Sequence, residues 1–163
     1  MEKAWLKSYP AGVPAEIDVN EFKSIDQLLD RSVSKFRDRV AYINMGKSLT
    51  YGELDGHTRD FAAYLQSLGL PKGARVAVMM PNLLQDPICI YGILRGGYTV
   101  VNCNPLYTSR ELEHQLKDSG AEAIVIVENF ASVLQECIAN TPLKHVIVTS
   151  LGDMLGFPKA AIV

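Results

Sequence analysis

Hydrophobic residues recur every three or four positions in several stretches of the chain, the spacing of amphipathic helices. Three of these stretches follow a Ser or Thr that has a Gln or Glu three residues later, which is the pattern of a capping box. They follow Ser24, Thr50 and Thr108. Gly69 and Gly120 stand where the second and third stretches stop, and glycine is the usual residue after a helix. We predict helices in all three places, the first from about residue 25 to 37.

Two further segments predict helices of a different kind. Ile88–Leu94 is apolar almost all round, which indicates a buried helix. Asp86 is suited to cap it, with Pro87 in its first turn. Phe130–Ile138 has helical spacing, and we expect Asn129 to cap it.

Short runs rich in β-branched residues alternate with these helices and predict strands. The runs cover residues 75–80, 98–101, 123–127 and 145–149. A hairpin is predicted separately from Val40–Ile43 and Ser48–Thr50, which flank a Met-Gly-Lys turn. Because a helix-length segment separates each pair of the four runs, we predict an α/β fold: a mostly parallel sheet with helices on its faces.

The pattern divides the chain into three parts. Residues 1–20 carry aromatic residues and prolines without a sustained period, and we interpret them as an irregular N-terminal arm. Residues 21–150 form the α/β scaffold, and residues 151–163 form a weakly patterned tail.

Composition narrows the class of protein. The chain has 163 residues, of which 48% are hydrophobic and 21% charged, so it can bury one sizeable core. Its net charge of −2 gives no field that would attract nucleic acid. No apolar run approaches the roughly 20 residues of a membrane span, and the first residues do not resemble a secretory signal. Three widely spaced cysteines match no zinc or disulfide pattern, so we expect buried thiols in a reducing cytoplasm.

Ligands of parallel sheets usually lie beyond the carboxyl ends of the strands. The three junctions there, residues 79–82, 102–105 and 127–130, contain no glycine. A phosphate cradle needs small residues so that backbone N–H groups can approach the oxygens, and the two common glycine-rich phosphate motifs are absent. We therefore predict no nucleotide site in this sequence, and a dinucleotide-dependent oxidoreductase is disfavoured.

Single residues do not change this picture. We interpret His57 as a solvated residue on the polar side of its helix, and His145 as a polar residue at the start of a strand. His114 lies three residues from both Glu111 and Lys117, so local charge pairing is expected. No nucleophile elbow or carboxylate pair is present. We predict no catalytic, cofactor-binding or metal-ligating residue.

The loop Asn102–Tyr107 leaves two alternatives open. Two asparagines flank Cys103, and Pro105 restricts Asn104 to extended geometry. The asparagine side chains can satisfy backbone groups in a tight turn and do nothing more. Alternatively, the loop lines part of a pocket that residues outside this chain complete.

Several motifs together resemble a known family. The segments LTYGEL (49–54), RVAVMMPN (75–82), GILRGG (92–97) and VNCNPLYTSREL (101–112) occur in the order expected of adenylate-forming enzymes. With EHQLKDSGA (113–121), the last segment is similar to the bacterial long-chain fatty acyl-CoA synthetases. Trp5 and Tyr9 are similar as well, whereas Gly96 replaces the alanine that is usual in the family. The resemblance covers nearly the whole chain and thins after Asp153.

The resemblance implies a fold and a reaction. The chain would be part of the large N-terminal domain of an enzyme that joins a long-chain fatty acid to ATP as an acyl-adenylate and passes the acyl group to coenzyme A, with Mg²⁺ offsetting phosphate charge. The family's phosphate loop, its adenine and ribose motifs and its catalytic lysine do not occur here. We therefore expect the N-terminal part of a longer enzyme, inactive alone and binding none of ATP, Mg²⁺ or coenzyme A. A free-standing α/β interaction or small-ligand module is the alternative.

The resemblance also suggests partners. Related enzymes can dimerise through N-terminal segments, so we expect residues 1–20 to contact a second subunit. A sheet edge without its neighbouring strand favours self-association of the isolated chain. A cytoplasmic enzyme with an apolar substrate is compatible with peripheral contact on the inner face of the membrane, whereas no nucleic-acid partner is expected.

Overall fold

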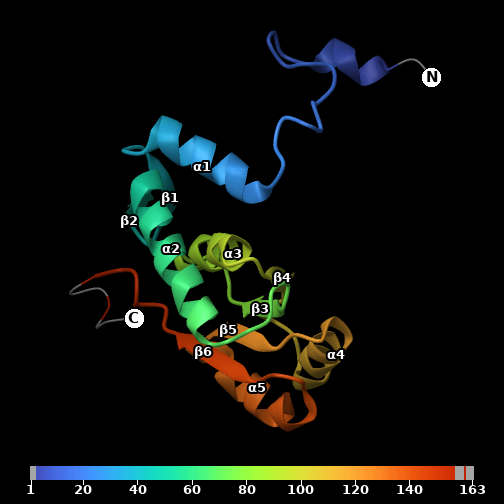
Figure 1. Cartoon of the computed structure of the whole chain (residues 1–163), viewed down its shortest axis with the longest axis vertical. Helices are drawn as coiled ribbons and strands as arrows, with labels where there is room; N and C mark the ends of the chain where they lie inside the picture. Colours follow the sequence, from blue (N-terminus) through green and yellow to red (C-terminus); the bar gives the residue numbers. More distant parts are fainter. Residues whose placement is uncertain (1–2, 157–159, 161–163) are drawn as a thin grey trace.

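The computed structural model describes residues 3–156 and 160. At its centre lies a four-stranded parallel sheet of order β4–β3–β5–β6 (Figure 1). The strands are β3 (Arg75–Met79), β4 (Thr99–Asn102), β5 (Ala123–Val127) and β6 (His145–Thr149). The predicted α/β architecture with a parallel sheet is confirmed.

Helices cover both faces of this sheet. Helices α2 (Tyr51–Ser67) and α3 (Gln85–Arg95) lie on one face, and α4 (Ser109–Ser119) and α5 (Ala131–Cys137) lie on the other. Helix α3 connects β3 to β4 on one face of the sheet. Helices α4 and α5, which connect β4 to β5 and β5 to β6, cross on the opposite face. This is a doubly wound arrangement, in which β3 and β5 flank the point where the winding changes direction.

Alternation along the central strands builds the two cores. Val76 and Val78 point toward α2 and α3, whereas Ala77 and Met79 point toward α4 and α5. Every residue of β5 is buried. A strand that is apolar at each position is buried on both faces, which explains why the sequence of β5 shows no polar alternation.

A smaller unit packs against α2 and α3, on their side away from the sheet. It consists of α1 (Ile25–Phe36) and the hairpin formed by β1 (Val40–Asn44) and β2 (Lys47–Thr50). The hairpin turn places Met45 and Gly46 at φ values of 48° and 74°, as expected of a tight turn with left-handed residues. Its core consists of Leu29, Val33, Leu49, Leu54, Leu84 and Ile88.

The capping motifs are confirmed in two of three cases. Thr50 and Thr108 each form complete capping boxes with the glutamate three residues later. At the first helix, Ser24 Oγ accepts the N–H of Gln27, but Gln27 Oε1 accepts the N–H of Lys23, at 2.8 Å, rather than that of Ser24. That box is therefore only half formed.

Two predicted caps are wrong. Asp86 lies inside α3, which begins at Gln85 after a position without a side-chain cap. Asn129 lies in the 3-10 turn η2 (Glu128–Phe130), which precedes α5. At α3, Leu84 and Gln85 are buried and the helix begins at Gln85, one residue before Asp86. Tertiary packing therefore overrides the local capping preference of Asp86.

The segments at the two ends differ in their relation to the body. Residues 3–20 contain the 3-10 turn η1 (Ala4–Ser8) and project away from the sheet (Figure 1). Trp5 and Tyr9 in this arm are 53% and 43% exposed. Another 3-10 turn, η3 (Ile138–Asn140), follows α5. After β6 the chain forms turns over residues 151–155, and residues 157–159 and 161–163 of the predicted tail lie outside the described residues.

Candidate functional site

The junctions beyond the carboxyl ends of β3 and β5 are the places where a parallel sheet usually holds a ligand. The junction after β3 contains Met80, Leu83 and Leu84, which are at most 8% exposed, whereas β5 ends at the buried Val127 and is followed by the exposed polar residues Glu128 and Asn129. Neither junction contains a glycine, the small residue that lets backbone N–H groups approach phosphate oxygens. That these junctions hold no nucleotide stays a prediction.

The loop between β4 and α4 is a tight turn held by Asn104. Its side-chain oxygen accepts the N–H of Leu106 at 3.0 Å, and its backbone oxygen accepts the N–H of Tyr107 at 3.1 Å. This is the local turn chemistry of asparagine. Asn104 thus has the local turn role, and a pocket completed by residues outside this chain stays a prediction.

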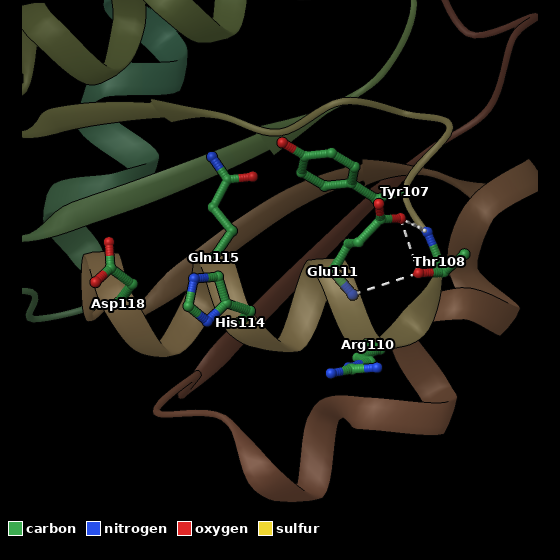
Figure 2. Close-up of a pocket in the computed structure, with 7 residues that line it drawn as sticks. All are labelled: Tyr107, Thr108, Arg110, Glu111, His114, Gln115 and Asp118. Atoms are coloured by element: carbon green, nitrogen blue, oxygen red, sulfur yellow. Dashed lines mark hydrogen bonds between the residues drawn. The ribbon is translucent and has the colours of Figure 1, made fainter.

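A hollow of about 760 Å³ lies beside the same loop (Figure 2). The lining residues are Tyr107, Thr108, Arg110, Glu111, His114, Gln115 and Asp118. Figure 2 shows Tyr107, on the loop, and Gln115, on α4, on the same side of the helix, with Arg110 pointing away from them. The pocket is therefore made almost entirely by one helix and the loop that precedes it.

Two of the lining residues are engaged in capping. Thr108 donates from its backbone N–H and its hydroxyl to Glu111 Oε2, at 2.9 and 2.8 Å. Hydrogen bonds from the backbone and then the side chain of Thr108 lower the pKa of Glu111. Glu111 is thus an ionised acceptor at neutral pH and is unsuited to general acid catalysis.

Gln115 joins the helix to the sheet. Its Nε2 donates to the backbone oxygen of Asn102, at the end of β4, at 2.9 Å. Its Oε1 is buried and has no hydrogen-bond partner among the described residues. The amide thus anchors the loop, and one acceptor remains unsatisfied beside the pocket.

The expected charge pairing of His114 is not what the structure shows. Glu111 is occupied by its capping box, and Lys117 pairs instead with Glu113, at 2.5 Å. His114 is exposed on α4. No contact described for the chain joins His114 to a nucleophile, so the pocket lacks the base–nucleophile geometry of covalent catalysis.

The three thiols are buried, as predicted. Burial raises the pKa of Cys89 to about 12 and that of Cys103 to about 11. Because the thiolate is the reactive form, neither group is a nucleophile at neutral pH. In the described ranges, moreover, no three His, Cys, Asp or Glu side chains gather as metal ligands would.

The environment of His57 corrects one detail of the sequence interpretation. His57 is exposed, as expected, but Asp55 is only 9% exposed and is not a surface neighbour of His57. Asp55 Oδ1 accepts from Arg95 Nη1 at 2.8 Å and from Arg59 Nε at 3.1 Å. Sequence reasoning missed the pair of Asp55 and Arg95 because these two residues lie 40 positions apart and no local spacing links them.

Arg95 is the centre of a polar network between three helices. From α3, its guanidinium also donates to Thr58 Oγ1 on α2 at 2.9 Å and to Asp30 on α1 at 2.7 Å. Burial acts to raise the pKa of Asp55, but hydrogen bonds from Arg59 and Arg95 outweigh it, and the pKa is lowered. The network therefore positions helices rather than a substrate.

Comparison with known proteins establishes the family. The family model described as "AMP-binding enzyme" matches residues 29–162. The chain belongs to this AMP-binding family. Across its whole length it is 55% identical to the long-chain-fatty-acid–CoA ligase of Yersinia pestis and 53% identical to a protein of the same name from Escherichia coli. It spans 29% of the length of each.

Solved structures support the same placement within the AMP-binding family. A long-chain-fatty-acid–CoA ligase from Archaeoglobus fulgidus superposes with a TM-score of 0.72 at 27% identity, over 81% of this chain and 29% of that protein. A benzoate CoA ligase from Burkholderia xenovorans superposes with a TM-score of 0.73 at 26% identity, over 78% of this chain and 26% of that protein. The α/β sheet described above is therefore an element of adenylate-forming ligases.

Proposed function

We propose that this chain is the N-terminal part of a long-chain fatty acid–CoA ligase, and that it acts there as scaffold. The observation that carries the proposal is the 55% identity to such a ligase over the whole of this chain. The chain spans only 29% of the length of that ligase. The junctions after β3 and β5 support a scaffold role, since they contain no glycine-rich phosphate loop.

In this proposal the reactants bind elsewhere in the ligase. A long-chain fatty acid, ATP with Mg²⁺, and coenzyme A would be held by sequence that follows residue 163. The coding sequence beyond Val163 is expected to continue into a glycine- and threonine-rich loop and, later, a lysine. A free-standing α/β interaction or small-ligand module predicts instead that the reading frame stops.

The first prediction concerns activity. We expect the 163-residue chain to show no fatty-acid-dependent exchange of pyrophosphate into ATP, and the whole ligase to show robust exchange. The physical reason is that acyl-adenylate formation needs positioned phosphate ligands, which these residues do not supply. Isotope exchange measured on both proteins checks this, with circular dichroism as the control that the short chain is folded. Exchange by the short chain would contradict the scaffold role.

Partners of the whole ligase form a second part of the proposal. The arm of residues 1–20 contacts a second subunit, which is supported by the exposed Trp5 and Tyr9 and by the distance of the arm from the sheet (Figure 1). The enzyme is cytoplasmic and touches the inner membrane face peripherally, because its substrate partitions into lipid. No helix of residues 3–156 is long and apolar enough to cross a bilayer.

Removing residues 1–20 from the whole ligase tests the arm. We expect the mass measured by light scattering to fall from that of a dimer to that of a monomer, because the apolar contacts of the arm are lost. Co-sedimentation with anionic phospholipid vesicles should be unchanged by the deletion, since membrane contact is assigned to the acyl substrate and not to the arm. An unchanged mass rules out the arm as the dimer contact.

A further inference from the structure

The hairpin formed by β1 and β2 buries one of its faces and exposes the other. Leu49 is 2% exposed and belongs to the core of the smaller unit, and its register partner Tyr42 lies on the same face. Val40 and Ile43 pair with the two neighbours of Leu49 in β2, and neighbouring residues of a strand point to opposite faces. Val40 and Ile43 therefore share the outer face, and the register shift between Val40 and Tyr42 makes this possible.

The exposed side of the hairpin carries a row of apolar side chains. Val40 is 50% exposed and Ile43 is 70% exposed, and Met45 in the turn is 50% exposed. We call these three residues the hairpin row. They run from the base of the hairpin to its turn. A group of this kind differs from the single exposed apolar residues that are normal on a protein surface.

The surroundings of the hairpin row are cationic. Residues 35–47 contain four lysines or arginines and one aspartate, which gives a net charge of +3, whereas the whole chain carries −2. Lys35 Nζ and the Arg39 guanidinium carbon lie 5.1 and 5.3 Å from the centre of the Phe36 ring, at the end of α1 that leads into the hairpin. In the described part of the chain neither cation pairs with a carboxylate.

Cations without partners indicate what kind of surface the hairpin row meets. Lysine and arginine are almost never fully buried unless they are paired, because removing an unpaired charge from water is costly. The apolar interior of a folded domain is therefore a poor partner for a row that Lys35 and Arg39 border. A bilayer of anionic phospholipid offers acyl chains to the apolar row and phosphate groups to the cations.

The hairpin is separate from the arm to which the subunit contact is assigned. Figure 1 shows the arm leaving α1 at its N-terminal end, whereas the hairpin follows the C-terminal end of that helix. The 12 residues of α1 place about 18 Å of helix between the two. A lipid contact through the hairpin is thus compatible with a subunit contact through the arm.

We propose that the outer face of the β1–β2 hairpin lies on an anionic phospholipid surface, with Ile43 and Met45 in the headgroup region and Lys35 and Arg39 beside lipid phosphates. This inference rests on the peripheral membrane contact proposed above and names the surface that makes it. The apolar substrate gives the reason for the contact, and the hairpin gives the site. A hairpin of this size reaches only the boundary of headgroups and acyl chains, so the contact is reversible and weakens as salt is added.

Co-sedimentation of the whole ligase with vesicles of equal parts phosphatidylcholine and phosphatidylglycerol, without fatty acid, tests this surface. Ile43→Asp should weaken binding by about tenfold or more, because it replaces an inserted apolar side chain with a charge that the lipid repels. The double variant Lys35→Gln with Arg39→Gln should weaken binding by about tenfold and remove most of the preference over vesicles of phosphatidylcholine alone. Leu106→Asp and Arg110→Gln are the matched controls, since both residues are exposed near the start of α4, and they should leave binding unchanged.

Exchange of pyrophosphate into ATP, measured on each variant, keeps the lipid contact separate from the ligase function. The hairpin variants should retain the exchange rate of the unmodified ligase, which also shows that they are folded. A protein that lacks exchange but loses vesicle binding with Ile43→Asp contradicts the ligase function and supports the surface. Vesicle binding that is equal in all variants overturns the surface, and an unmodified ligase that binds no vesicles overturns the membrane contact altogether.

A polarity-sensitive fluorophore attached to Ile43→Cys gives a direct readout of insertion. Its emission should shift to shorter wavelengths with the anionic vesicles and stay unchanged with phosphatidylcholine alone. If the added cysteine labels no more than the unmodified ligase does, later parts of the polypeptide cover the hairpin, and the proposal is overturned.

Discussion

Replacing Arg95 with methionine is expected to lower the free energy of unfolding by about 3–5 kcal/mol. The guanidinium is 13% exposed and pairs with the equally buried Asp55 carboxylate at 2.8 Å. Methionine keeps much of the side-chain volume but removes the charge, so the buried Asp55 carboxylate would keep only the exposed Arg59 as a charged donor. Urea denaturation of the chain and the variant measures the loss.

Two further variants separate this explanation from a loss of packing. Arg59 contacts the same carboxylate, but its side chain is 62% exposed, so Arg59→Met should cost only a few tenths of a kcal/mol. The double variant Arg95→Met with Asp55→Leu removes both buried charges and should recover most of the loss. If the double variant were as unstable as Arg95→Met alone, the unpaired charge would not be the cause.

The effect of Arg95→Met should depend on pH in a defined direction. The pKa of Asp55 is lowered in the folded chain, below an unfolded value of about 3.9. Its contribution to stability is therefore fully present above that value and is lost as the pH falls through the folded pKa. In the variant, protonation relieves the unpaired charge. The difference between the two proteins should shrink in acid and stay constant from mildly acidic to neutral pH.

Replacing Gly92 with alanine is expected to destabilise the chain by about 1–3 kcal/mol, although alanine is the better helix former. Gly92 lies where α3 meets α2. A Cβ atom there would lie 2.8 Å from Phe61 Cδ1 and 3.2 Å from both Phe61 Cβ and the backbone oxygen of Thr58. Because one of these atoms is backbone, the two helices would have to separate.

Gly56 offers the matched control in the neighbouring helix. It lies inside α2, and a Cβ atom would meet nothing within 4 Å. Gly56→Ala should therefore stabilise the chain by about 0.5–1 kcal/mol through helix propensity alone. Thermal denaturation of both variants tests the opposite signs. Equal stabilisation by the two alanines would show that α2 and α3 do not need the close approach.

The sequence predicted those elements whose signal is local. Thr50 and Thr108 form the expected capping boxes because both partners lie within one helical turn. Asn104 closes its turn through atoms two and three residues away. The strand at residues 123–127 was recognisable because a central parallel strand is apolar throughout.

Local preference failed where burial competed with it. Asp86 and Asn129 are good capping residues by composition, yet neither caps a helix, and at α3 the buried Leu84 and Gln85 set the start instead. For the candidate site, the sequence indicated the loop after β4 as a place to look. The bond from Gln115 to Asn102 that anchors this loop depends on how α4 lies against the sheet.

By itself, the sequence determined the succession of strands and helices, the parallel sheet that this succession requires, and the absence of glycine-rich phosphate motifs. Only the tertiary structure decided that Arg95 and Asp55 meet across 40 residues and that Val40 and Ile43 share the exposed face of the hairpin. The physical reason is range: helix periodicity, caps and turns are interactions over a few residues. Ion pairs between helices and the face that a hairpin exposes depend on how whole elements pack.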